Sequence, residues 1–186
     1  YWEALGVLTG REVRAQEMVH CFRQTVAEIR SRTGKIRGKK RVYFEAIHSK
    51  MKTFSPDAMP VFALRTAGGI PVASDAEPVR GTNIAAYGKE RILAHAREID
   101  VYLAQKGVMN QPTISQIKNE PGFEIIKAAQ NDQIYIIDER IISRPTLRLL
   151  NGIFRIRKIL YPERFSAFPE PAACSLAGNR APGGSP

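Results

Sequence analysis

The stretch RVYFEAIHSKMKTF, residues 41 to 54, places an acid and a base three positions apart near the end of a predicted strand. Its first residues favour a β-strand, and Glu45 and His48 follow. A carboxylate and an imidazole at this spacing can share a proton, as a general acid and base do. They can also ligate a metal ion. An acid–base role would need a third group that orients the pair within hydrogen-bond reach.

Two ligands make only part of a metal site, because structural zinc is held by four. Cys21 and Cys174 lie far apart and outside any CxxC pair, so they add nothing to such a site. We therefore predict no metal site made by the protein alone. The polar residues fit better at the lip of a pocket, where they orient a bound molecule. Glu45 and His48 are the residues of this stretch predicted to form that lip.

Other chemistries lack their motifs. No GxGxxG follows a strand and opens a helix, which argues against a dinucleotide site. GKIRGKK has the wrong spacing for a phosphate-binding loop, and no Ser or Thr follows its lysine. No GxSxG nucleophile turn is present.

The elements that must position these residues alternate between strand and helix. A capping box formed by Thr9 and Glu12 predicts a long amphipathic helix over residues 9 to 31. Beyond it, alternating elements predict an α/β fold, a three-layer sandwich with a largely parallel sheet. The predicted strands are 41–46, 70–74, 99–104 and 133–138, and the predicted helices are 57–67, 88–97, 113–119, 121–130 and 145–160.

Ligands of open parallel sheets bind beyond the carboxyl ends of the strands. Those ends are predicted at residues 45–54, 105–111 and 141–146. Gln105 is therefore a candidate contact. Arg144 is another, since a guanidinium there can hold an anionic group by paired hydrogen bonds.

The chain has 186 residues, 44% of them hydrophobic, which suits one compact domain with an appendage. An opening without Met suggests a fragment or a processed chain. No apolar run approaches the roughly 20 residues that span a bilayer. The tail from residue 169 to 186 is rich in Pro, Gly, Ala and Ser, which is typical of a flexible segment.

The formal net charge is +10, and much of the excess lies in residues 30 to 41. Nucleic-acid binding through this run would make affinity fall steeply with salt. The run has no interleaved aromatic residues, so a solvated helix end is favoured and no nucleic-acid partner is predicted.

The order and spacing of several segments resemble the C-terminal lobe of class III periplasmic solute-binding proteins, which serve ABC importers for iron-siderophore complexes, haem and cobalamin. These segments are LGVLTGREVRAQEM, RVYFEA, LRTAGGIPVAS, YGKERILAHAREIDVYLA, EPGFEIIKAAQNDQIYIIDE and RPTLRLLNGIFRIRKILYPERF.

The resemblance implies a domain division. Residues 1–40 would be the end of a missing N-terminal lobe and the connecting helix between lobes. Residues 41–168 would be a Rossmann-like ligand-binding lobe, and 169–186 the flexible tail. The ligand, an iron complex or a corrinoid, would lie in a cleft between lobes. The protein would be no enzyme, would carry no cofactor, and would be periplasmic or lipid-anchored, peripheral to the membrane.

The resemblance also implies two sets of contacts. Glu90, at the start of the helix in YGKERIL, would dock on arginines of the ABC permease transmembrane subunits. Two further pairs would join the ligand contacts: Met51 and Phe54, from the loop after the first strand of the lobe, and Asn83 and Tyr87, from the loop before that helix. The rival hypothesis is an α/β enzyme that uses Glu45 and His48 as its acid–base pair.

Overall fold

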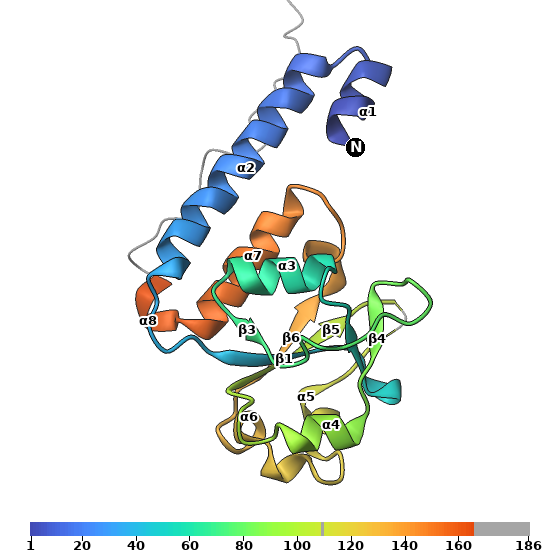
Figure 1. Ribbon diagram of the computed structural model, residues 1–186, viewed down its shortest axis with the longest axis vertical. Coiled ribbons are helices and arrows are strands. Elements are labelled where there is room, and N and C mark those ends of the chain that lie inside the picture. The colour runs from blue at the N-terminus through green and yellow to red at the C-terminus, as the bar shows by residue number, and fades with distance from the viewer. Residues whose placement is uncertain (109, 166–186) are drawn as a thin grey trace, which may run out of the picture.

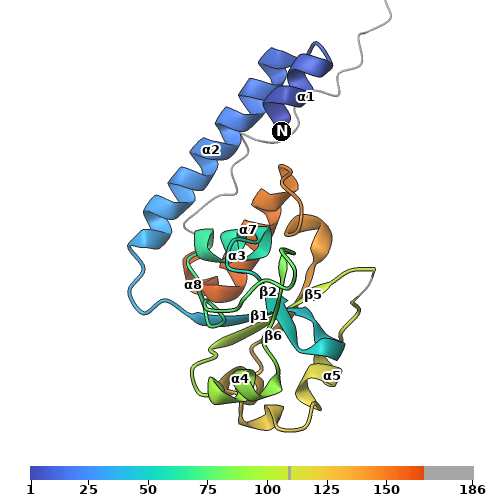
Figure 2. The ribbon, with the colours of Figure 1, turned by 45° about the vertical axis from the view of Figure 1, so that its right-hand side comes forward.

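The computed structural model describes residues 1–108 and 110–165, which form a layered α/β lobe with a long helix projecting from it (Figure 1). The helices are α1 (Trp2–Leu8), α2 (Glu12–Gly34), α3 (Met59–Thr66), α4 (Lys89–Ala94), α5 (Ile114–Lys118), α6 (Lys127–Gln130), α7 (Arg148–Leu160) and α8 (Pro162–Phe165). Single 3-10 turns are η1 (His48–Lys50), η2 (Phe123–Ile125) and η3 (Glu139–Ile141). A central sheet has α3 and α7 on one face and α4, α5 and α6 on the other (Figures 1 and 2).

The sheet is mixed but mostly parallel. Its strands are β1 (Arg41–Ile47), β2 (Lys52–Phe54), β3 (Ile70–Pro71), β4 (Ile84–Ala86), β5 (Val101–Lys106) and β6 (Ile134–Asp138). Their order is β4-β2-β1-β5-β6, and β3 pairs with the start of β1. The pairs β1–β3, β1–β5 and β5–β6 are parallel. The predicted α/β fold with a largely parallel sheet is confirmed.

Alternation along β1 divides the core into two parts, because successive side chains of a strand point to opposite faces. Val42 and Phe44 face α3 and α7 in what we call the upper core. Tyr43 belongs to what we call the lower core, together with Tyr102 of β5 and side chains of α4, α5 and α6. Glu45 shares the side of Tyr43, so an acid enters the lower core.

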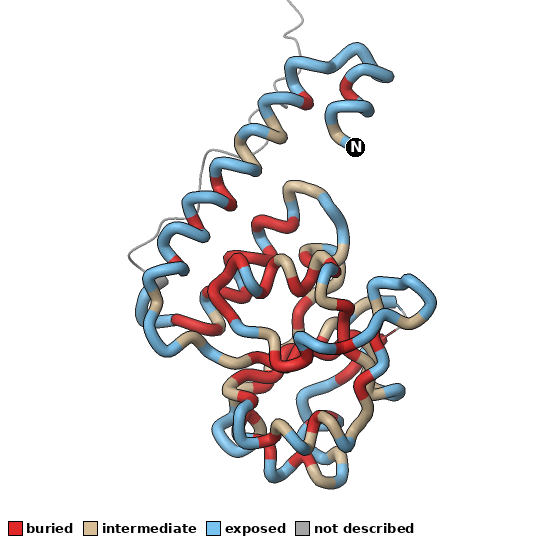
Figure 3. Tube along the Cα trace, viewed as in Figure 1, coloured by how far each residue is buried: buried red, intermediate tan, exposed pale blue. Residues whose placement is uncertain are grey.

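Helix α2 is built into the lobe at one end only. Val26 and Ile29 are buried in the upper core, and the Thr33 hydroxyl donates to the carbonyl of Thr66 at 3.2 Å. The amino-terminal part of the helix is mostly exposed and stands away from the sheet (Figure 3). At 1.5 Å per residue, the helix is about 35 Å long.

The capping box predicted for α2 is wrong. Residues before it form α1, and the Thr9 hydroxyl donates to the carbonyl of Leu5 at 2.8 Å, so Thr9 ends α1. Arg11 occupies the cap position of α2 without a side-chain hydrogen bond. The T-G-R-E segment therefore joins two helices, and its threonine is the C-cap of α1 and not the N-cap of α2.

Two strands were not predicted. After β1 and η1 the chain returns as β2, antiparallel to β1, and β4 pairs antiparallel with β2. The segment expected to be a loop, residues 47 to 54, is therefore a hairpin. The tail beyond residue 165 lies outside the described residues, as does the predicted lobe boundary at 168.

Among residues 1–108 and 110–165, no helix is both long enough and apolar enough to cross a membrane.

Candidate binding edge of the sheet

Glu45 and His48 meet at the carboxyl end of β1. Strand β1 ends at Ile47, and the η1 turn folds His48 back so that its Nδ1 lies 2.9 Å from Glu45 Oε2. The hydroxyl of Tyr102, on the neighbouring strand β5, donates to the same carboxylate oxygen. The sequence predicted the pair but did not single out Tyr102, which lies within the predicted strand 99–104.

Hydrogen bonding and burial shift the pKa values of the groups around Glu45. The hydrogen bond that the His48 ring donates to Glu45 raises the pKa of His48 above its usual 6.5, against the opposing effect of partial burial. Burial raises the pKa of the Tyr102 phenol well above 10, so this group stays a neutral donor. The side chain of Glu45 is 0% exposed, whereas that of His48 is 14% exposed.

Tyr102 supplies the third group that the acid–base hypothesis requires. However, a carboxylate without exposed surface cannot contact a substrate in this structure. Glu45 therefore acts on its neighbours, and only His48 of the pair reaches the surface.

Asn110 joins the ends of β1 and β5, and no motif in the sequence pointed to it. Its Oδ1 accepts the backbone N–H of His48 at 3.1 Å. Its Nδ2 donates to the carbonyls of Ala46 at 3.0 Å and Gln105 at 2.6 Å. A nearly buried amide thus fixes the backbone on both sides of the strand edge.

Gln105 and the segment before Arg144 lie at the same edge. The Ser143 hydroxyl donates to Gln105 Oε1 at 2.7 Å, which ties the residues after β6 to the end of β5. Arg144 is exposed. Beside this edge is a hollow of about 560 Å³ with a charged rim, lined by Lys106, Gly107, Val108, Gln111, Ile136, Asp138, Glu139 and Arg140.

The other predicted contacts fall on the β2–β4 side. Phe54 is buried in the upper core, where its ring meets Phe44 edge-on at 5.1 Å. Tyr87 is buried against Tyr43, with ring centroids 5.7 Å apart. Met51 is half-buried, and Asn83 is exposed.

The predicted contacts thus form two groups. His48, Gln105 and Arg144 lie at the ends of β1, β5 and β6, and Met51, Asn83 and Tyr87 lie around β2 and β4. Direct contact with a ligand stays a prediction for all of them. Burial leaves Glu45, Phe54 and Tyr87 better suited to support a surface than to form it.

Helix α4 presents an exposed carboxylate. Gly88, with φ of +86°, turns the chain into the helix, and Glu90 lies exposed in its first turn. Both neighbours in sequence are basic, yet each is engaged elsewhere. Lys89 Nζ lies 2.6 Å from Glu120, and Arg91 lies 2.5 Å from Asp75 with its guanidinium over the Tyr87 ring.

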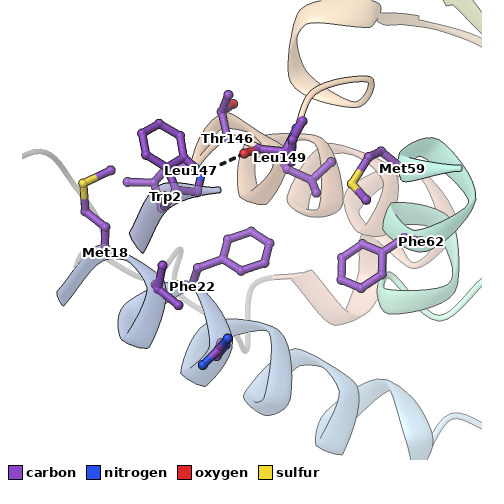
Figure 4. Close-up of a pocket in the computed structure, with 11 residues that line it drawn as sticks. Trp2, Met18, Phe22, Met59, Phe62, Thr146, Leu147 and Leu149 are labelled. Carbon is purple, nitrogen blue, oxygen red and sulfur yellow. Dashed lines mark hydrogen bonds between the residues drawn. The ribbon is translucent and has the colours of Figure 1, made fainter. Parts of the chain in front are cut away.

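An apolar pocket of about 320 Å³ separates α2 from the lobe (Figure 4). Trp2 of α1 closes one side, and its indole N–H donates to the carbonyl of Pro145 at 2.9 Å. Phe22 from α2 and Phe62 from α3 point into the space between these helices (Figure 4). The lining residues are Trp2, Met18, Val19, Phe22, Arg23, Met59, Phe62, Pro145, Thr146, Leu147 and Leu149.

The carboxyl ends of β1, β5 and β6 thus form a polar edge of the sheet, at which the Glu45 carboxylate is buried and His48 is partly exposed. The family model described as "Periplasmic binding protein" matches residues 2–141. The chain therefore belongs to the periplasmic binding protein family, in its class III solute-binding group, as the sequence resemblance predicted. A search of curated proteins gives no match.

Solved structures share the fold. One is a possible iron-binding periplasmic solute-binding protein from Staphylococcus epidermidis, 26% identical with a TM-score of 0.69, covering 86% of this chain and 60% of that one. An Fe3+-hydroxamate transport system protein from Saccharomonospora viridis is 22% identical with a TM-score of 0.67, covering 85% and 53%. A molybdate periplasmic binding protein from Haemophilus influenzae is 19% identical with a TM-score of 0.71, covering 89% and 49%. The chain thus spans roughly half the length of these relatives.

Proposed function

We propose that this chain is the C-terminal lobe and connecting helix of the substrate-binding component of an ABC importer. It binds an iron complex, such as a siderophore or haem, or a corrinoid, between two lobes and delivers it to the membrane permease. The proposed place of work is the periplasm or the outer side of the membrane. The observation that carries the proposal is the family match together with the half-length coverage of two relatives whose names refer to iron.

The exposed apolar surface supports a preceding lobe. The pocket between α2 and the lobe is lined almost wholly by apolar side chains. Val7, Leu8 and Val13, at the far end of the helical arm, are also exposed. Contiguous exposed apolar surface usually marks an interaction site, and a lobe ahead of α1 would cover it.

Ligand screening tests the proposal directly. The full-length protein with both lobes is mixed with ferric siderophores, haem and corrinoids, and binding is followed by absorbance and thermal shift. We expect one of these classes to raise the melting temperature, because a ligand that binds only the folded state stabilises it. The 186-residue chain alone should bind the same ligand more weakly, since half the cleft wall is missing. If no compound of the three classes changes the absorbance or the melting temperature, the proposed ligands are contradicted.

Glu90 is proposed to dock on arginines of the permease. The ion pairs of Lys89 and Arg91 draw both cations toward other carboxylates. No ion pair of Glu90 is found in the part of the chain that the structure describes. An exposed carboxylate at a helix start can meet a guanidinium in a charge-assisted, bidentate pair, and such pairs orient docking.

Replacing Glu90 with alanine should impair uptake while ligand affinity stays unchanged, because the side chain is exposed on α4 and is not among the predicted ligand contacts. Uptake of radiolabelled ligand in cells and affinity of the purified protein are measured together. Glu124→Ala, which removes a carboxylate from the η2 turn, is the charge-matched control and should transport normally. Normal uptake by the Glu90 variant would contradict the docking role, unless a carboxylate on the other lobe suffices. Combining the change with removal of that carboxylate separates the two cases.

A further inference from the structure

We propose that His48 recognises an anionic oxygen of the ligand, and that Glu45, Tyr102 and Asn110 are the residues that position it. This inference rests on the proposed function and narrows its ligand class. The lobe would prefer an anionic chelate, with carboxylate or other deprotonated oxygens on its surface, over a neutral or cationic one.

The ring of His48 is oriented by a hydrogen bond on its buried side. Its Nδ1 lies 2.9 Å from Glu45 Oε2, and a carboxylate acceptor requires Nδ1 to be the donor. Glu45 is itself held by the Tyr102 hydroxyl from the neighbouring strand. The other ring nitrogen, Nε2, has no hydrogen-bond partner among the described residues and is absent from their buried unpaired atoms. The ring therefore turns its free nitrogen to the surface.

The backbone of His48 is held as firmly as its ring. Asn110 accepts its N–H and donates to the carbonyls that flank it in β1 and β5. A binding group fixed at both backbone and side chain loses little freedom when a ligand arrives. Such supporting contacts are what a preorganised recognition site requires.

Charge decides what such a group can bind. Glu45 favours the imidazolium, as the raised pKa of His48 reflects. Glu120, which also faces His48, is already paired with Lys89 at 2.6 Å. Lys50 and Lys52 follow on the same hairpin and line a separate hollow together with Asp75 and Glu77. An imidazolium whose Nε2–H is free donates a charge-assisted hydrogen bond, which is stronger when the acceptor is an anion.

The experiment compares three chelates of different charge on the full-length protein. Ferric citrate is the anionic probe, ferrioxamine B the cationic probe and cyanocobalamin the neutral probe. Binding is measured by titration calorimetry at about pH 6 and about pH 9. We expect ferric citrate to bind most tightly, and more tightly at the lower pH, where His48 is charged. His48→Gln should weaken that binding about tenfold, as expected for loss of one hydrogen bond between charged groups.

Two further variants separate recognition from folding. Lys50→Gln removes one charge from the same turn and should leave the pH dependence of binding unchanged. Glu45→Gln keeps the shape of the positioning residue, and an NMR titration should show a lower pKa for the His48 ring. The double variant Glu45→Gln/His48→Gln contains no unpaired buried charge, so its binding can be measured if the single His48 variant folds poorly.

The outcomes are distinct. Equal or tighter binding of the neutral or cationic probe would overturn the inference while leaving the proposed function intact. Unchanged citrate binding by His48→Gln would also overturn it. If the wild-type protein binds none of the three chelates, both this inference and the proposed ligand class are contradicted.

Discussion

Replacing Gly152 with alanine is expected to destabilise the folded chain by about 2 kcal/mol, within the usual range for overpacking a core. A Cβ at this position of α7 would lie 2.2 Å from the carbonyl oxygen of Ile141 and 2.8 Å from a methyl group of Ile142. In an open helix the same change would stabilise by about 1 kcal/mol, because alanine is the better helix former. The contact with backbone therefore decides the sign.

Gly107→Ala is the matched control. The three atoms nearest to a Cβ there all belong to the side chain of Glu139, which is flexible and able to turn away. Urea unfolding followed by circular dichroism should show a small change for this variant and a clearly lower midpoint for Gly152→Ala. Equal urea midpoints for the two variants would mean that the backbone around Ile141 moves aside at little cost and would contradict the prediction. The same segment continues to Ser143, which is hydrogen-bonded to Gln105 at the binding edge, so its packing against α7 also positions that edge.

Removing the imidazole of His48 is expected to cost about 3 kcal/mol near pH 6, because it leaves Glu45 as a buried charge without its partner. The effect should depend on pH. The folded-state pKa of His48 is raised above 6.5, so the stabilisation by the pair is fully present below about 6.5 and is lost as pH rises through the raised pKa. His48→Ala should therefore cost less at about pH 9 than at about pH 6.

Adding Glu45→Gln to His48→Ala should recover part of the lost stability, since the buried charge is then gone. Urea unfolding of the wild type, both single variants and the double variant at the two pH values gives the coupling directly. A loss that is the same at both pH values and is not reduced in the double variant would indicate a packing role for His48 and no charge pairing.

The long-range pattern of the fold was readable from the sequence because it depends on apolar periodicity. The strands around Val42, Tyr102 and Ile134 were all predicted within two residues of their ends. Strands β2 and β4 were missed because each has three residues, too few to show a period, and exists only by pairing with its neighbour.

The candidate site was readable only in part. Glu45 and His48 stood out by type and spacing, but their roles depended on the direction of the side chains. Alternation along β1 puts Glu45 on the side of Tyr43, which already predicts burial. The role of Asn110 could not be predicted from the sequence. Two of its hydrogen bonds reach residues more than 60 positions away, His48 and Ala46, and only the bond to Gln105 is local.

Helix α2 gives the lobe a lever. Val26, Ile29 and Thr33 belong to the packed body, so the carboxyl-terminal half of the helix must turn whenever the lobe turns. The opposite end projects by several helical turns, and a small rotation of the lobe is amplified into a larger sweep of that end. Gly10, with its φ of +65°, lies in the turn that joins α1 to α2. Under the proposed two-lobe arrangement, we expect bending between the lobes to occur at this turn, ahead of α2, and not at the end of the helix where the strand-and-helix pattern starts.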